Sequence, residues 1–350
     1  MSKSMDRVVG FDVGDRRIEV CVVSLGVGQV LAREKLATRR EALEPWLAAA
    51  PRSRIVLETG THAPWIARAA QAAGHEVIVA DARSVELITK SRKKTDRRDA
   101  ELLARLGRSD LELLRPVHVR SQTTQRQRAL LRMRDALVRA RAQQINCVRG
   151  VMKTDGRPLQ SCGAEAFARR VRETADTSWR GALEPVLAAI DALTGQIRSY
   201  DAMLTAIAER DYAPALERVS QPAGVGTLTA LALILAVEDP RRFRNGREMS
   251  AYLGLVPRRR QSGDSDPDLG ISKEGDAYAR RLLVSAAHYV LERGPDTDLK
   301  RWGLALEARW GPRTRKRAAV AVARKLAVLL WRLWIDGQRY EPLRHAAAAA

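Results

Sequence analysis

Residues 7–24, RVVGFDVGDRRIEVCVVS, decide the fold of the N-terminal part of the chain. Two runs rich in β-branched residues meet at Gly14 and Asp15, a pattern that is typical of a β-hairpin. The following run, GQVLAREKLA at 28–37, has the composition of a third strand. The sequence therefore predicts a fold that begins with three consecutive strands.

Helices and strands alternate after this hairpin. Apolar periodicity predicts helices over 40–50 and 63–74 and short strands over 54–60 and 75–82, and a further helix follows. The predicted order βββαβαβα implies a partly parallel sheet with helices on its faces. In such a sheet, catalytic side chains are expected at the ends of strands.

Four acidic residues stand at positions that this sheet could bring together. The segment KSRKKTDRRDAELLARL at 90–106 places Asp96 and Asp99 three residues apart, on one helix face, inside a strongly basic stretch. Asp12 lies in the first strand and Glu58 ends the fourth. Four converging carboxylates would repel one another without cations between them, and their hard oxygen ligands suit Mg²⁺ or Mn²⁺. Two such ions support phosphodiester transfer.

Each acid also has an ordinary explanation when it is taken alone. An Asp before Gly often forms a turn, a Glu before Thr and Gly can cap a helix, and paired acids on a surface helix are usually solvated. The joint occurrence of the four, in the strand order of a ribonuclease-H-like fold, favours a metal site. Asp15 fits the hairpin turn and Asp81 ends a strand, so neither is included.

The charge of the chain indicates a polyanionic partner. The 350 residues carry 61 Lys and Arg against 41 Asp and Glu, a formal net charge of +20. No apolar run reaches the roughly 20 residues that a membrane span needs, so nucleic acid is favoured over a membrane. The chain start does not resemble a signal peptide and the three cysteines have no paired spacing, so we expect a cytoplasmic protein. The residues expected to hold DNA phosphates over the acids are Arg92, Lys93, Lys94, Arg97 and Arg98.

The middle of the chain is predicted to be a helical spacer at 113–212, between an N-terminal domain at 1–112 and a C-terminal domain at 213–345. Two apolar stripes with steps of three and four residues run through it. Such stripes fit an antiparallel helical hairpin and an intermolecular coiled coil equally well. The stripes are Leu130, Met133, Leu137, Ala140, Gln144 and Val148, and Val186, Ile190, Leu193, Ile197, Tyr200, Leu204 and Ile207.

The C-terminal third contains a glycine turn and a polar loop. Gly224 and Gly226 precede an apolar helix, as in a helix-hairpin-helix-like turn whose backbone amides receive a phosphate. A loop rich in Gly and Ser follows YLGLVP and begins with three arginines that could also contact nucleic acid, Arg258, Arg259 and Arg260. Helices are predicted over 276–293 and 313–336.

The motifs FDVG, LETG and KTDRRDAELLARL, with GVGTLTALALILAVEDPRRFRNGREMSAYLGLVP and GISKEGDAYARRLLVSAA, closely resemble the DEDD transposases of the IS-one-ten insertion-sequence family. The resemblance implies an α/β plus α chain with a RuvC-like N-terminal domain, a helical coiled-coil spacer and a mainly helical transposase domain. It implies an Mg²⁺-binding tetrad carried here by Asp12, Glu58, Asp96 and Asp99. It also implies recombination of donor and target DNA by a homo-oligomer, a dimer or a tetramer, guided by a bridge RNA.

The family pattern places a nucleophilic serine before a glycine in the loop, which matches Ser262 in RRRQSGD. Gln261 stands where many members have Ser or Thr, so Ser265 is a reserve candidate, whereas Ser272 is interpreted as a helix N-cap. No histidine stands near Ser262, so its activation would have to come from the metal site. Two other classes fit the composition: a RuvC-like junction nuclease that uses the four acids and no serine, and a non-catalytic packaging protein.

Overall fold

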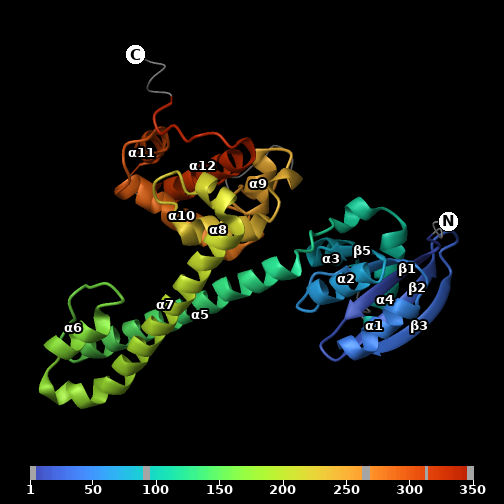
Figure 1. The fold of residues 1–350 in the computed structure, drawn as a ribbon, viewed down its shortest axis with the longest axis horizontal. Coiled ribbons are helices and arrows are strands. Elements are labelled where there is room, and N and C mark those ends of the chain that lie inside the picture. Colours follow the sequence, from blue (N-terminus) through green and yellow to red (C-terminus); the bar gives the residue numbers. More distant parts are fainter. Residues whose placement is uncertain (1–4, 90–94, 262–268, 312–313, 345–350) are drawn as a thin grey trace. The chain divides into compact units, whose positions relative to one another are not determined.

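The computed structural model describes residues 5–89, 95–261, 269–311 and 314–344. The chain divides into two compact units, Met1–Ser121 and Gln122–Ala350. The first is a mixed α/β unit and the second is built from helices (Figure 1). This agrees with the predicted α/β plus α class. The predicted domain boundaries, between residues 112 and 113 and between residues 212 and 213, stay predictions.

The described part of the first unit contains a five-stranded sheet with the order β3-β2-β1-β4-β5. β2 pairs antiparallel with both β1 and β3, whereas β4 pairs parallel with both β1 and β5. The predicted hairpin and the partly parallel sheet are therefore confirmed. The strands are β1 (Arg7–Val13), β2 (Arg17–Ser24), β3 (Val30–Ala37), β4 (Arg54–Glu58) and β5 (Glu76–Ala80).

Helices cover both faces of this sheet. On one face, Leu43 of α1 and Ile66 of α2 pack with Phe11 in one buried cluster, and on the other Leu103 of α4 packs with Val8. The two clusters arise because successive side chains of a strand point to opposite faces. The bounds are α1 (Arg40–Ala49), α2 (Ala63–Ala72), α3 (Ala82–Thr89), α4 (Asp96–Arg108) and the short 3-10 helix η1 (Leu111–Leu114). The separate helix α3 was not predicted.

The second unit combines a long helical pair with a compact helical core. α5 and α7 form the pair, and α8, α9, α10 and α12 share one large buried cluster (Figure 1). The bounds are α5 (Gln122–Thr154), α6 (Phe167–Thr174), α7 (Thr177–Val219), α8 (Thr227–Val237), the 3-10 helix η2 (Pro240–Arg242), α9 (Gly246–Tyr252), α10 (Ala277–Glu292), α11 (Asp298–Trp310) and α12 (Arg315–Asp336). The predicted helices over 276–293 and 313–336 correspond to α10 and α12, and α11 was missed.

Within this chain, α5 and α7 pack against each other as an antiparallel pair. Contacts join Gln127 to Asp211 near one end and Arg141 to Thr194 farther along, so residue numbers rise on one helix as they fall on the other. α7 bends at Tyr212, where φ is −133° and ψ is 16°, two residues before Pro214. The hairpin alternative left open by the sequence is thus present within one chain.

The predicted seam positions are partly wrong. Ile190, Ile197 and Leu204 are buried in α7 as expected, but Met133 of the α5 stripe is 46% exposed. The buried stripe of α5 shares only Val148 with the predicted one, and it includes polar residues that an apolar pattern leaves out. It comprises Thr124, Gln127, Leu131, Arg141, Ile145, Val148 and Met152.

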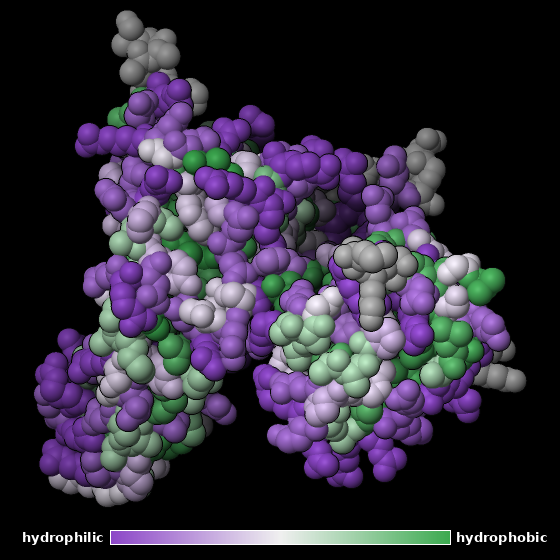
Figure 2. All heavy atoms as spheres, turned by 45° about the vertical axis from the view of Figure 1, so that its right-hand side comes forward, coloured by the Kyte–Doolittle hydropathy of each residue, from purple (hydrophilic) through white to green (hydrophobic). Residues whose placement is uncertain are grey.

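The surface drawn in Figure 2 is largely hydrophilic, with hydrophobic side chains exposed in patches between polar ones. Of the helices that the structure describes, none is both long enough and apolar enough to span a bilayer.

Candidate active site

Asp12 and Glu58 lie at the carboxyl ends of two neighbouring parallel strands. The register of β1 against β4 pairs Phe11 with Leu57, and Asp12 and Glu58 are the next residues of the two strands. Both side chains are half-buried, whereas the residues just before them are fully buried. The two predicted carboxylates therefore come to the same edge of the sheet.

A glycine in β1 lets α4 lie directly on the strand. A Cβ atom added to Gly10 would stand 2.0 Å from the carbonyl oxygen of Ala100 and 2.6 Å from the backbone nitrogen of Ala104. Any side chain at this position would collide with helix backbone, which cannot move aside as a side chain can. Gly10 therefore sets the distance between α4 and β1.

A second close approach fixes the direction of α4. A Cβ atom at Gly107 would stand 2.3 Å from Cγ2 of Val56 and 3.2 Å from Cγ1 of Val8. The end of α4 thus lies over Val8, its middle over Gly10, and its first turn points toward Asp12. Two strand residues advance about 6.6 Å and four helix residues about 6 Å, so the step from Gly10 to Asp12 matches the step from Ala100 to Asp96.

We call Asp12, Glu58, Asp96 and Asp99 the acidic edge. Asp12 shares a sheet face with Gly10, because the two lie two positions apart in the strand, and this is the face that α4 covers. Asp96 and Asp99 form the acidic first turn of α4. The structure therefore brings the four predicted acids to one end of the β1, β4 and α4 layer.

Arginines hold the far end of α4. Arg54 of β4 donates from Nη1 to the carbonyl oxygen of Gly107 at 3.0 Å. Arg108 donates from Nε to Leu25 and from Nη2 to Gly26, each at 2.9 Å, in the turn between β2 and β3. The first bond satisfies a carbonyl group of the helix end, and the other two tie that end to the turn, so together they fix α4 along its axis.

An ion pair on the flank of α4 contributes further to its docking. Arg33 of β3 donates to Oε2 of Glu101 at 2.5 Å, and Arg105 donates to Oε1 at 2.8 Å. The hydrogen bond from Arg33 holds the pKa of Glu101 below its ordinary value, against the opposing effect of burial. Burial raises the pKa of the neighbouring Cys21 thiol. Glu101 therefore joins α4 to β3 as an ion-pair partner of Arg33 and is not a member of the acidic edge.

The sequence reasoning missed Glu19, a fifth carboxylate on the covered face. The hairpin register places Glu19 of β2 opposite Asp12, so their side chains share one face. Its Oε1 lies 2.7 Å from Nζ of Lys35, and its side chain is 15% exposed. The sequence could have indicated Glu19, because a hairpin that pairs Val13 with Ile18 must also pair Asp12 with Glu19.

The ligand chemistry of the acidic edge fits a hard divalent cation. All four candidates are carboxylates, carried by two strands and one helix. Among the residues that the structure describes, no three acidic, His or Cys side chains are gathered closely enough to hold a metal ion as they stand. The edge is thus a scaffold whose acids share one location without forming a closed ligand cage.

The structure describes two of the five basic residues that are predicted to hold DNA phosphates beside the acids. Arg97 and Arg98 are exposed in the first turn of α4, next to Asp96 and Asp99. Arg92, Lys93 and Lys94 lie outside the described residues.

Two antiparallel contacts close the base of the predicted serine loop. Pro257 bridges Ile271, and the backbone N–H groups of Arg258 and Ser272 donate to Gly270 and Val256 at 3.0 and 2.8 Å. Arg258, Arg259 and Arg260 leave this base as an exposed segment. Ser262 and Ser265 lie outside the described residues, so their roles stay predictions.

The interpretation of Ser272 as the N-cap of the next helix was wrong. α10 begins at Ala277, and Oδ1 of Asp276 accepts hydrogen bonds from the backbone N–H groups of Tyr278 and Ala279 at 3.0 and 2.9 Å. Asp276 is therefore the cap.

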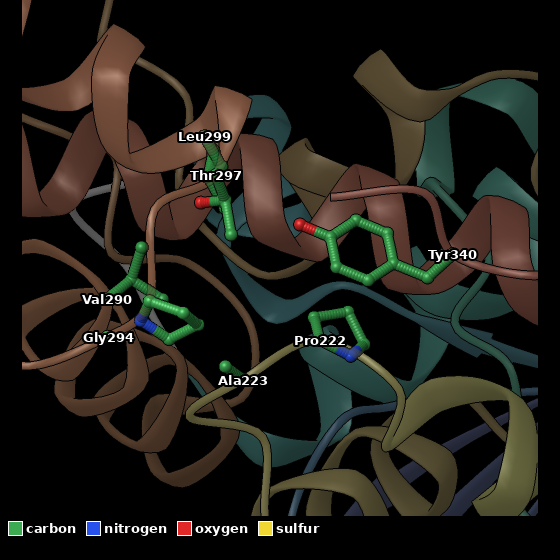
Figure 3. A pocket seen from close by; sticks show the side chains of 8 residues that line it. Pro222, Ala223, Val290, Gly294, Thr297, Leu299 and Tyr340 are labelled. Atoms are coloured by element: carbon green, nitrogen blue, oxygen red, sulfur yellow. The ribbon is translucent and has the colours of Figure 1, made fainter. Parts of the chain in front are cut away.

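Packing requirements already explain one glycine of the predicted phosphate-binding turn. Gly224 has φ +89°, and a Cβ atom there would stand 2.8 Å from the Tyr289 ring. The neighbouring Pro222 and Ala223 line a small pocket with Tyr340 and Thr297 (Figure 3). Gly226, by contrast, has open space beside it at the N-cap of α8. Phosphate binding by Gly224 and Gly226 stays a prediction.

Both parts of the chain match known protein families. The family model described as "Transposase IS116/IS110/IS902 family" matches residues 216–300, and a transposase model of the DEDD type matches residues 9–154. The second range contains the whole acidic edge, and the first contains the glycine turn and the loop base.

Curated relatives extend the similarity along the chain. The transposase for insertion sequence element IS1111A of Coxiella burnetii is 32% identical over 256 residues, which cover 71% of this chain and 68% of that protein. The transposase for insertion sequence element IS1328 of Yersinia enterocolitica is 28% identical over 342 residues, which cover 94% and 97%. The similarity therefore spans both units.

Proposed function

Because this chain belongs to the IS116/IS110/IS902 family of transposases and is thus a DNA transposase, we propose that it cuts and rejoins DNA with the acidic edge and a serine nucleophile. The observation that carries this proposal is the docking of α4 on β1 through Gly10. This close approach directs Asp96 and Asp99 toward the strand ends that carry Asp12 and Glu58.

The acidic edge is proposed to bind Mg²⁺, with Mn²⁺ as the alternative ion. Transposases of the DEDD type generally use a divalent metal. Asp12, Glu58, Asp96 and Asp99 would hold it, while Arg97 and Arg98 bind DNA phosphates beside it. When bound, such an ion stabilises charge on the attacking and leaving oxygens of a phosphodiester.

Ser262 is proposed as the nucleophile, with Ser265 as the reserve candidate. The serine Oγ would form a bond to phosphorus while the bond to one DNA oxygen breaks. The hydroxyl proton leaves the serine, and the freed DNA oxygen takes up a proton. The phosphoserine ester keeps the energy of the phosphodiester, so rejoining needs no external energy source.

The remaining elements of the proposal concern partners. We propose that a bridge RNA pairs with donor and target DNA, that the protein acts as a dimer or tetramer in the cytoplasm, and that the α5 and α7 region forms the spacer at 113–212. The transposase domain would then span 213–345. Sequencing RNA that copurifies with the protein tests the guide, and light scattering tests the oligomer.

Neutral variants of the acidic edge test its role. Asp12→Asn and Glu58→Gln should lower strand cleavage by at least about 100-fold, since changes in residues that only support metal ligands already cost 10- to 100-fold. DNA binding should persist because the basic residues remain. Asp15→Asn is the matched control, since Asp15 in the adjacent hairpin turn has a side chain that is 95% exposed. Normal cleavage by the two variants would remove the acidic edge from the mechanism.

The serine is tested separately with suicide substrates and peptide mass mapping. Ser262→Ala should bind DNA normally but form no covalent adduct and no recombinant product. An adduct on Ser265 would move the assignment by three residues. Mg²⁺-dependent cleavage without any adduct would favour the junction nuclease, and the absence of cleavage in the wild-type protein would favour a packaging protein.

A further inference from the structure

A long groove crosses the helical unit, and none of the predicted site residues lines it. It has a volume of about 1740 Å³ and runs between α11, α12 and the C-terminal segment at 338–344. Leu255, Pro257 and Ile271, at the base of the loop, close one part of it. The groove is therefore continuous with the residues that anchor the predicted serine loop.

The described residues that line this groove are strongly cationic. They include nine Lys and Arg against three Asp and Glu. α12 alone contributes Lys316, Arg317, Arg324, Lys325 and Arg332. Among the residues that the structure describes, Lys316, Arg324 and Arg332 form no salt bridge, whereas many other arginines of the unit are paired with acids, as Arg134 is with Asp201. Unpaired cations in a hollow attract a polyanion.

Two tryptophans of α11 face the same groove beside cations. Nζ of Lys325 lies 3.9 Å from the ring centroid of Trp302, and the guanidinium carbon of Arg317 lies 5.3 Å from that of Trp310. Trp310 is 40% exposed. Aromatic faces interleaved with cations suit a nucleic-acid strand whose bases are unpaired, because a stacked base needs a free π-face and its phosphate needs a positive charge.

We propose that this groove binds a single-stranded segment of DNA, with phosphates along Arg324 and Arg332 of α12 and a base stacked on Trp310. The groove shares its wall with the base of the loop that carries the candidate nucleophile, so the strand would pass next to that loop. The assignment rests on the DNA-transposase function and requires neither the acidic edge nor the serine mechanism.

Binding of a fluorescent dT20 oligonucleotide to the full-length protein, followed by anisotropy at several salt concentrations, tests the assignment. Trp310→Ala should weaken binding by about 5- to 150-fold, the range expected for removal of one base–aromatic stack, and Trp310→Phe should restore most of it. Arg324→Gln combined with Arg332→Gln should weaken binding and lower the salt slope by about 1.4, which corresponds to two phosphate contacts on a single strand.

A double variant with the same change of charge provides the control. Arg169→Gln with Arg170→Gln alters two exposed arginines of α6 and should leave dT20 binding nearly unchanged. All the replaced side chains except Arg324 are exposed, and the single variants Trp310→Ala and Arg332→Gln repeat the test without that residue. Thermal melts check folding.

Three results would overturn the proposal. The first is that the groove variants bind dT20 as tightly as the wild type. The second is that the groove variants and the α6 variant lose equal affinity for dT20. The third is that the groove variants lose as much affinity for a 20-base-pair duplex as for dT20. Tighter binding of rU20 than of dT20 would reassign the groove to RNA. Failure of the acidic-edge proposal would look different, because Asp12→Asn would then cleave normally while groove variants still bound dT20 poorly.

Discussion

α4 packs mainly against β1 and β2, and α7 mainly against α5 and α8, and the two helices are positioned by different means. α4 meets β1 through glycine and small apolar residues, with its backbone against that of the strand at Gly10. α7 meets α5 through apolar clusters and through polar contacts between them, including Arg134 to Asp201 at 2.5 Å and Arg141 to Thr194 at 3.2 Å.

The difference follows from what each contact has to specify. Two backbones in direct contact cannot shift toward each other, so this contact fixes the carboxylates of the first turn of α4 relative to Asp12 and Glu58. Two long helices with only apolar side chains could slide by one turn, whereas paired polar groups at several levels are satisfied in one register. The first contact therefore sets the position of a site, and the second sets the alignment of a spacer.

The largest effect is expected from Gly10→Val, which would drive a branched side chain into the backbone of α4. Overpacking typically costs about 1–3 kcal/mol, and more where backbone must move. We expect a cost at the upper end or above it, together with loss of cleavage, because the first turn of α4 would leave Asp12. Urea unfolding and a nicking assay measure the two effects.

Gly26→Val is the control for Gly10→Val, since a Cβ atom at Gly26 meets nothing within 4 Å. If the Gly10 variant kept both its stability and its cleavage, the backbone approach would not be what positions the acidic edge.

The second effect compares two apolar residues of the α7 seam. Ile197 is 2% exposed, whereas Leu193 is only half-buried. A charge introduced at Ile197 must be buried without a partner, so Ile197→Glu should destabilise the protein by about 3 kcal/mol or more, and Leu193→Glu by clearly less. Thermal unfolding measures both. An equal loss of stability in the two variants would mean that both residues lie in the seam, as the sequence predicts.

Much of the sheet could be predicted from the sequence, because its signals are local. The β-branched runs, the turn at Gly14 and the short buried strands each belong to one element. The position of Asp12 and Glu58 at neighbouring strand ends also followed, since strand ends of parallel neighbours meet at one edge. The metal site formed with Asp96 and Asp99 stays a prediction. Glu19 was missed because the hairpin register was not extended past the turn to its acid.

The seam of α5 and α7 could not be predicted from apolar residues alone. Arg134 and Arg141 are not part of the predicted apolar stripe, and their partners Asp201 and Thr194 lie more than 50 residues away. Only knowledge of the pairing reveals that these polar residues face inward. α11 was missed for a related reason, since its single fully buried residue is Gly303, which leaves little apolar periodicity to detect.

A third prediction concerns the polar contacts themselves. Arg134 is 17% exposed at its side chain and Asp201 is 43% exposed. Arg134→Ala should cost about 1–2 kcal/mol, because Asp201 and the surrounding seam lose a charged hydrogen-bond partner. In a double-mutant cycle with Asp201→Ala, a coupling of about 1 kcal/mol is expected. Arg139→Ala, with a side chain that is 68% exposed in the same helix, is the control and should change stability little. Strict additivity would indicate that this contact does not specify the register.

The smallest effect concerns the ion pair that flanks α4, where a polar contact assists an apolar docking. Since the bond from Arg33 lowers the folded-state pKa of Glu101 from its ordinary 4.5, the pair contributes stability above pH 4.5. This contribution is lost as the pH falls through the lowered folded value, because protonation removes the charge. The pair is partly exposed, so its contribution should stay below about 1 kcal/mol.

Glu101→Gln should therefore be less stable than the wild type at pH 7 and approach the stability of the wild type near pH 3, as measured by urea unfolding at each pH. Glu112→Gln, an exposed acid of the same unit, controls for the charge change. A gap between wild type and Glu101→Gln that stayed constant from pH 7 to pH 3 would show that the carboxylate stabilises α4 by shape or hydrogen bonding rather than by its charge.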